Sequence, residues 1–189
     1  MTTLQPRSPK WALLTVKEIV LRELLGRIGP DTLLLAMPTA LPYWNREALR
    51  TISHSLSGRL VFVTDLRPHG LFLYLIFRYG VSARPTVSIE HQFGGIDDAI
   101  IAISRAGFRT GWSLERVCVP MTRGETRAFK QLDDLFDLPA MLGSAAHALL
   151  RGGLSLHLDA LMNPAIVSET HYGRLVSHWR RLARRVRGT

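Results

Sequence analysis

The chain has 189 residues, 47% of them apolar, and carries 24 Lys and Arg against 15 Asp and Glu. This composition excludes a disordered chain and supplies enough apolar side chains for a compact domain. No apolar run reaches the roughly 18 residues that a membrane-spanning helix needs. The first residues lack a secretory signal, and the one cysteine, Cys118, forms neither an internal disulfide nor a cysteine-based zinc site. We therefore expect a cytoplasmic protein with a single domain over residues 1–189.

The first half of the chain predicts alternating helices and strands. Amphipathic spacing indicates helices, and short runs of apolar residues indicate strands. The expected helices are 10–27 and 43–56, and the expected strands are 32–37, 59–64 and 85–91. Residues 66–70 are typical of a turn, whereas the continuous apolar run 71–79 fits a buried helix and a buried strand equally.

The second half continues this alternation. Helices are expected at 99–106, with Asp97 or Asp98 as the N-cap, and at 125–136, 140–150 and 165–187. Strands are expected at 114–119 and 154–158. The alternation predicts an α/β fold with a mixed or mostly parallel sheet covered by helices. The alternative is a two-layer α+β sandwich.

Polar residues follow several of the expected strands. They are Asp65, His91, Thr122, Arg123 and Asp159. In an open α/β sheet, ligands bind beyond the carboxyl ends of the strands, so these residues form the candidate ligand-binding rim. In an enzyme, His91 would act as the general base, and Asp97 or Asp159 would orient its ring.

Two short segments resemble known families. The segment from His91 to Asp97 resembles the His-x4-Asp block of lysophospholipid acyltransferases, although five residues separate the two side chains here. The segment from Ala106 to Arg123 is similar to the Gly-x-x-x-Gly…Val-Pro stretch of the ligand-binding domains of quorum-sensing regulators. Each covers no more than about a tenth of the chain, so neither identifies a family. The first resemblance implies acyl transfer with a histidine base.

The positive charge is concentrated at the C-terminus. Residues 171–189 contain no Asp or Glu and have six arginines: Arg174, Arg180, Arg181, Arg184, Arg185 and Arg187. The rest of the chain carries 18 Lys and Arg against 15 Asp and Glu. Apolar residues of this segment recur at helical spacing, which predicts an Arg-rich amphipathic helix over 165–189. Its basic face suits an anionic partner, namely a nucleic acid, an acidic protein or a membrane surface.

The chain contains no nucleotide-binding loop and no Gly-x-Ser-x-Gly motif, and its histidines lack the spacing of zinc ligands. We therefore expect no metal and assign no cofactor. The sequence predicts a non-catalytic protein that binds an anionic partner through its C-terminal helix. A small-molecule ligand is compatible with this prediction. The alternative function is that of a small transferase, acyl transfer in particular, with His91 as the general base.

Overall fold

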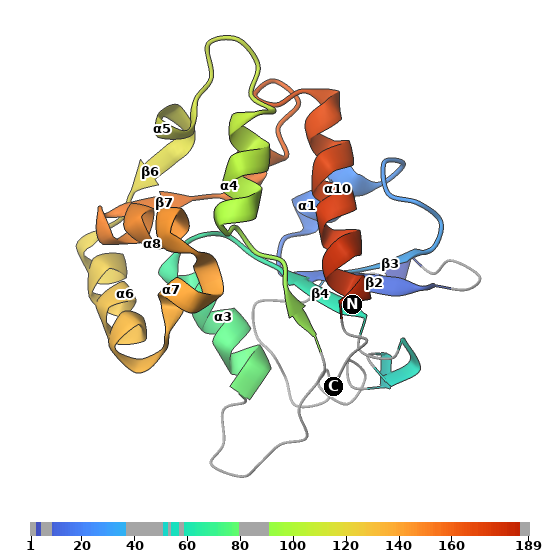
Figure 1. The fold of residues 1–189 in the computed structure, drawn as a ribbon, viewed down its shortest axis with the longest axis horizontal. Coiled ribbons are helices and arrows are strands. Elements are labelled where there is room, and N and C mark those ends of the chain that lie inside the picture. The colour runs from blue at the N-terminus through green and yellow to red at the C-terminus, as the bar shows by residue number, and fades with distance from the viewer. Residues whose placement is uncertain are drawn as a thin grey trace. The chain divides into compact units, whose positions relative to one another are not determined.

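The computed structural model describes residues 9–36, 51–52, 54–56, 59–79 and 91–185, together with the backbone of Thr3–Leu4. Helices alternate with the strands of two sheets, which confirms the predicted α/β fold with a mixed sheet (Figure 1). No helix within these residues is both long enough and apolar enough to cross a membrane.

The chain divides into two compact units. Unit 1 takes its residues from 1–63, 73–94 and 176–189, and unit 2 from 64–72 and 95–175. The two units are described separately below. The assignment of residues 1–189 to one domain stays a prediction.

The main sheet lies in unit 1, and its described strands have the order β1-β3-β2-β4-β5. The strands are β1 (Thr3–Leu4), β2 (Trp11–Thr15), β3 (Thr32–Ala36), β4 (Leu60–Val63) and β5 (Gln92–Phe93). Strands β3, β2, β4 and β5 pair in parallel, and β1 pairs antiparallel to β3. Every side chain of β2 and β4 is buried, as expected for central strands of a parallel sheet with both faces covered.

Helices pack on both faces of this sheet. The helices concerned are α1 (Glu18–Leu24), α3 (Pro68–Tyr79) and α10 (Glu169–Arg184). The Tyr74 ring of α3 lies 5.5 Å from the Phe62 ring of β4, measured between centroids. The Trp179 indole of α10 lies beside Gly94, where an added Cβ would also meet Val61. Because neighbouring side chains of a strand point to opposite faces, α3 and α10 cover opposite faces of the sheet at β4.

The prediction of one helix over residues 10–27 is wrong in its first half. Residues 11–15 form β2, and α1 begins only at Glu18. A strand between two parallel neighbours needs no polar face, so its apolar run does not alternate with polar residues. The charged residues that suggested an amphipathic helix, such as Lys17 and Glu18, lie beyond the end of β2.

Unit 2 is mainly helical. Its elements are α4 (Asp98–Arg105), α5 (Leu114–Val117), β6 (Cys118–Pro120), α6 (Arg123–Leu135), α7 (Leu138–Leu142), α8 (Ser144–Arg151), β7 (Leu154–Leu156) and α9 (Leu158–Leu161), with β6 antiparallel to β7. Oδ1 of Asp98 accepts a hydrogen bond from the Ala146 N–H at 2.7 Å, which ties α4 to α8. Nε2 of His147 lies 2.7 Å from Oδ1 of Asp133, which ties α8 to α6.

Most of residues 66–79 form one helix, α3, whereas the sequence predicted a turn followed by a run of undecided secondary structure. The predicted turn at 66–70 is wrong in its second half, because α3 already begins at Pro68. The run 71–79, for which periodicity favoured neither a helix nor a strand, continues α3. Proline suits the first turn of a helix, where its missing N–H has no intrahelical partner.

Three predicted elements in the second half of the chain have different boundaries. The predicted helix 140–150 is divided into α7 and α8 at Gly143, whose φ is +87°. In the predicted strand 114–119, the helical turn α5 precedes β6. The predicted C-terminal helix begins at Glu169 instead of residue 165, because Val167 forms a β-bridge with Phe108.

Other predictions are confirmed or lie outside the described residues. The strands at 32–37 and 59–64 and the helices at 99–106 and 125–136 are confirmed to within two residues. Asp97 caps α4 by accepting a hydrogen bond from the Ile100 N–H at 2.8 Å. The predicted strand 154–158 is shorter, as β7. Most of the predicted helix 43–56 and strand 85–91 lies outside the described residues.

Candidate functional site

The three residues predicted for catalysis belong to different units. His91 lies in unit 1, whereas Asp97 and Asp159 lie in unit 2. The His91 ring packs edge-on against Tyr74 and Phe77, with centroid distances of 5.4 and 4.7 Å. Asp97 caps α4, and Asp159 lies in the first turn of α9. Acyl transfer with His91 as the base stays a prediction.

A different carboxylate–histidine pair follows the end of β4. Leu66 and Leu156 form an antiparallel bridge, and this register places Asp65 opposite His157. Oδ2 of Asp65 lies 3.8 Å from Nδ1 of His157, while Oδ1 accepts a hydrogen bond from the Leu158 N–H at 2.7 Å. Asp65 is 5% exposed, and His157 is half-buried. At 3.8 Å the two groups are close enough for an electrostatic interaction but too far apart for a direct hydrogen bond.

Sequence reasoning selected Asp65 for the rim but did not select His157. The histidine stands at the end of an apolar strand, where a single histidine is more often a hydrogen-bonded core residue than a ligand. Only the pairing of Leu66 with Leu156 brings the two side chains together, and no local pattern in the sequence indicates that pairing.

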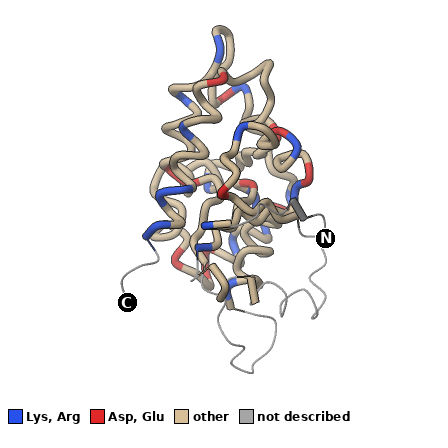
Figure 2. The backbone as a smooth tube through the Cα atoms, turned by 90° about the vertical axis from the view of Figure 1, so that its right-hand side faces the viewer, with Lys and Arg blue, Asp and Glu red and all other residues tan. Residues whose placement is uncertain are grey.

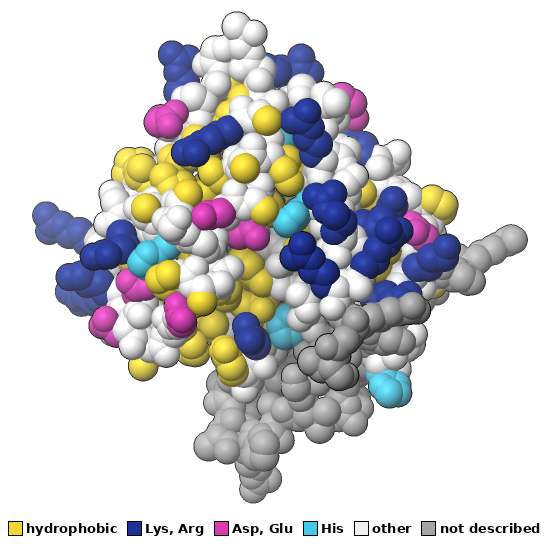
Figure 3. Space-filling view, viewed as in Figure 1, with side chains coloured by type: hydrophobic (Ala, Val, Ile, Leu, Met, Phe, Trp, Pro, Cys, Tyr) yellow, Lys and Arg dark blue, Asp and Glu magenta, His cyan; other side chains and the backbone are white. Residues whose placement is uncertain are grey.

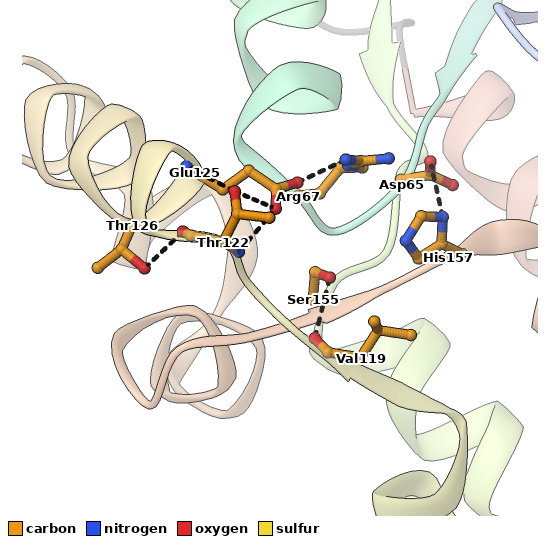
Figure 4. A network of polar contacts seen from close by, with 8 residues as sticks. All are labelled: Asp65, Arg67, Val119, Thr122, Glu125, Thr126, Ser155 and His157. Carbon is orange, nitrogen blue, oxygen red and sulfur yellow. Dashed lines mark hydrogen bonds and ion pairs between the residues drawn. The ribbon is translucent and has the colours of Figure 1, made fainter.

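Arg67 and the start of α6 form a second polar cluster, seen with the first in Figure 4. Nη2 of Arg67 donates a hydrogen bond to Oε1 of Glu125, and the Thr122 N–H donates to Oε2 at 2.9 Å. The Glu125 N–H in turn donates to Oγ1 of Thr122 at 3.2 Å, which completes a capping box. The Thr122 N–H, followed by Arg67, lowers the pKa of Glu125 to about 2. The predicted rim residue Thr122 is therefore the N-cap of α6.

We expect the titration of Glu125 to make the free energy of unfolding depend on pH in the acidic range. Between pH 4.5 and about 2, the carboxyl group binds a proton in the unfolded chain but not in the folded one. The free energy of unfolding should therefore fall as the pH decreases through this window. Glu125→Gln removes the titration, so its melting temperature should fall less over the window than that of the wild type. Asp134→Asn, at an exposed position of the same helix, is the control, and equal falls in both variants would contradict this role.

Helix α10 has a buried apolar side and an exposed cationic side. Its buried apolar residues are Tyr172, Leu175, Val176, Trp179 and Ala183. Its exposed arginines are Arg174, Arg181 and Arg184, and Arg185 is exposed in the turn directly after the helix; we call these four the α10 cationic face. Figure 2 shows basic positions along this helix, and Figure 3 shows Lys and Arg side chains gathered over it.

The spacing of the α10 cationic face follows from helix geometry. Arg174 and Arg181 are seven residues apart, about two turns, so they lie along one line of α10, opposite the buried stripe. Along the helix axis this interval corresponds to about 10.5 Å. Within the part of the chain that the structure describes, the four arginines make no ion pair and no side-chain hydrogen bond.

Arg180 does not contribute to this face. Arg180 is half-buried, and its Nη2 lies 3.4 Å from Oδ1 of Asp31 in unit 1, which neutralises its charge locally. Arg187 lies outside the described residues. The predicted set of six anion-binding arginines therefore contains four that are exposed and have no acidic partner among the residues that the structure describes.

The comparisons with known proteins do not assign a family to the chain: no protein-family model matches it, and no curated protein matches it. Among the described residues, no group of three or more His, Cys, Asp and Glu side chains has an arrangement that could hold a metal ion. Cys118 is half-buried, and its burial raises the pKa of the thiol.

Proposed function

We propose that the protein binds a phosphodiester polymer through the α10 cationic face. The observation that supports this proposal is the contrast among the arginines of α10 and the turn that follows it. Four arginines are exposed without an acidic partner among the described residues, whereas Arg180 is paired with Asp31. If these arginines served only to stabilise the fold, each would be expected to pair with a carboxylate, as Arg180 does.

The buried side of α10 argues against a membrane surface as the partner. An amphipathic helix binds a bilayer by inserting its apolar face among the lipids. In α10 that face is already used, because Trp179 is fully buried and its Nε1 donates a hydrogen bond to the Gly94 carbonyl at 2.8 Å. What the helix offers to a partner is charge and hydrogen-bond donors.

The chemistry of the face favours phosphate. Guanidinium groups present planar pairs of N–H donors that match two oxygens of one phosphate group. A nucleic acid carries such groups at regular intervals, and each one neutralised releases a condensed counterion. A row of arginines along one side of a helix matches a regular row of phosphates. The carboxylates of an acidic protein have no such regular repeat.

The proposal is tested with a variant that carries Arg181→Gln, Arg184→Gln and Arg185→Gln together. Its matched control carries Arg123→Gln, Arg127→Gln and Arg151→Gln, which remove the same charge at exposed positions of α6 and α8. With a fluorescein-labelled DNA oligonucleotide at low salt, we expect the α10 variant to bind more weakly by about 10-fold to about 100-fold, since each exposed charge contact contributes about 1 kcal/mol at most.

The control variant should bind within about threefold of the wild type, because its arginines lie outside the face. Equal losses in the two variants would show that net charge alone determines binding, which would contradict the proposal. Displacement of the oligonucleotide by polyglutamate at equal charge would instead assign the face to an acidic protein.

A further inference from the structure

The loop of residues 106–113, between α4 and α5, is held in place by backbone hydrogen bonds within unit 2. The Arg109 N–H donates to the Ile166 carbonyl and the Ser168 N–H to the Gly107 carbonyl, each at 2.9 Å. Between them, Phe108 forms a β-bridge with Val167. The loop is therefore a fixed platform, although its tip is exposed.

The tip of this loop presents an indole to solvent. Trp112 is 41% exposed, whereas Trp11 and Trp179 are 3% and 0% exposed. The Trp112 N–H donates to the Arg109 carbonyl at 3.0 Å, and Gly111 next to it has a φ of +87°, which only glycine adopts readily. The turn thus fixes the backbone of Trp112 while much of its ring remains uncovered. An exposed indole offers a partner a flat apolar face with an N–H donor at its edge.

Three exposed arginines lie within seven residues of Trp112 in the sequence: Arg105, Arg109 and Arg116. Nε of Arg109 donates to the Val167 carbonyl at 3.0 Å, and Nη1 of Arg116 donates to the Gly111 carbonyl. These bonds hold two of the guanidinium groups against the loop and leave their other N–H donors for a ligand. Glu115 is the one carboxylate between residues 99 and 120, so the loop region is cationic overall.

We propose that Trp112 is a stacking platform for an unpaired base of a single-stranded nucleic acid, with the three arginines of this loop region contacting its phosphates. The combination of an exposed aromatic ring and a cationic surround is how sequence-independent single-strand binding is achieved. A duplex hides the faces of its bases, and an acidic peptide has carboxylates without a regular supply of flat rings. This inference rests on the proposed function, because it specifies the polymer that the protein binds.

The test compares Trp112→Ala and Trp112→Phe with the wild type, on a single-stranded oligonucleotide and on its duplex. Trp112→Ala should bind the single strand about 10-fold more weakly, and Trp112→Phe within about threefold, because phenylalanine also stacks. Neither variant should change duplex affinity. Leu135→Ala, at an apolar position that is 74% exposed on α6, is the control and should bind both ligands as the wild type does. Because Trp112 is exposed, the melting temperatures should stay close to that of the wild type.

A second readout follows the indole directly. Tryptophan fluorescence of the wild type should be quenched by the single strand and much less by an oligonucleotide with abasic sites, and this difference should vanish in Trp112→Ala. Unchanged single-strand affinity in Trp112→Ala would overturn the inference, and so would quenching by polyglutamate equal to that by the oligonucleotide. The proposed function fails separately, when the α10 variant binds as tightly as the wild type. If Trp112→Ala still weakened single-strand binding in that case, the main contact would lie in the loop of residues 106–113.

Discussion

Replacing Trp179 with alanine is expected to lower the free energy of unfolding by about 3–5 kcal/mol. The side chain is fully buried, and its Nε1 donates a hydrogen bond to the Gly94 carbonyl at 2.8 Å. It joins α10 to the turn that follows β5, beside Val61 of β4. Removing it therefore opens a cavity in the core of unit 1 and leaves a carbonyl oxygen without its donor.

Trp179→Phe separates the contribution of the buried volume from that of the hydrogen bond. Phenylalanine fills much of the volume but has no N–H, so this variant should lose only part of the stability, about 1–3 kcal/mol. Urea denaturation followed by circular dichroism measures both variants. A loss below about 1 kcal/mol in Trp179→Ala would contradict the packing of α10 on the sheet, because an exposed side chain has an effect of that size.

Gly143→Ala is expected to lower the free energy of unfolding by about 3–5 kcal/mol. Part of this loss comes from a clash with a neighbouring side chain, which a control variant separates from backbone strain. Gly143 has a φ of +87°, and an added Cβ would lie 2.3 Å from Cγ of Asp98. Asp98 would have to move, which would break the hydrogen bond that it accepts from the Ala146 N–H and loosen α4 from α8.

Gly111 provides the matched control, because its φ is also +87° but no atom lies within 4 Å of an added Cβ. Gly111→Ala should therefore cost only the strain of the left-handed conformation, about 1–2 kcal/mol. The difference between the two variants, measured by chemical denaturation, isolates the contact with Asp98. Equal losses would show that Asp98 moves aside without cost.

The fold could be predicted where local signals are strong. Asp97 caps α4 as expected, and both α4 and α6 have a clear amphipathic pattern. The strand at 11–15 was missed because a fully covered parallel strand lacks the alternation that distinguishes strands from helices. The helical nature of residues 71–79 is decided by packing against the sheet, which the sequence pattern does not contain.

The candidate sites show the same division. The α10 cationic face could be predicted, because the arginines and the apolar stripe belong to one continuous segment with helical spacing. Pairings between distant segments could not be. Arg180 is neutralised by Asp31, and Asp65 meets His157, through contacts that only the folded chain creates. The exposure of Trp112 also depends on the folded loop, since its sequence neighbours do not distinguish it from a core tryptophan.

The salt dependence of nucleic-acid binding tests the central claim most directly. The logarithm of the binding constant should fall linearly with the logarithm of salt concentration, with a slope of about −0.7 per phosphate contacted in a single strand. The variant with Arg181→Gln, Arg184→Gln and Arg185→Gln should have a slope that is smaller in magnitude by about 2, corresponding to three lost contacts. The control with Arg123→Gln, Arg127→Gln and Arg151→Gln should keep the wild-type slope. The same slope in the α10 variant and the wild type would contradict the assignment of the α10 cationic face to phosphate binding.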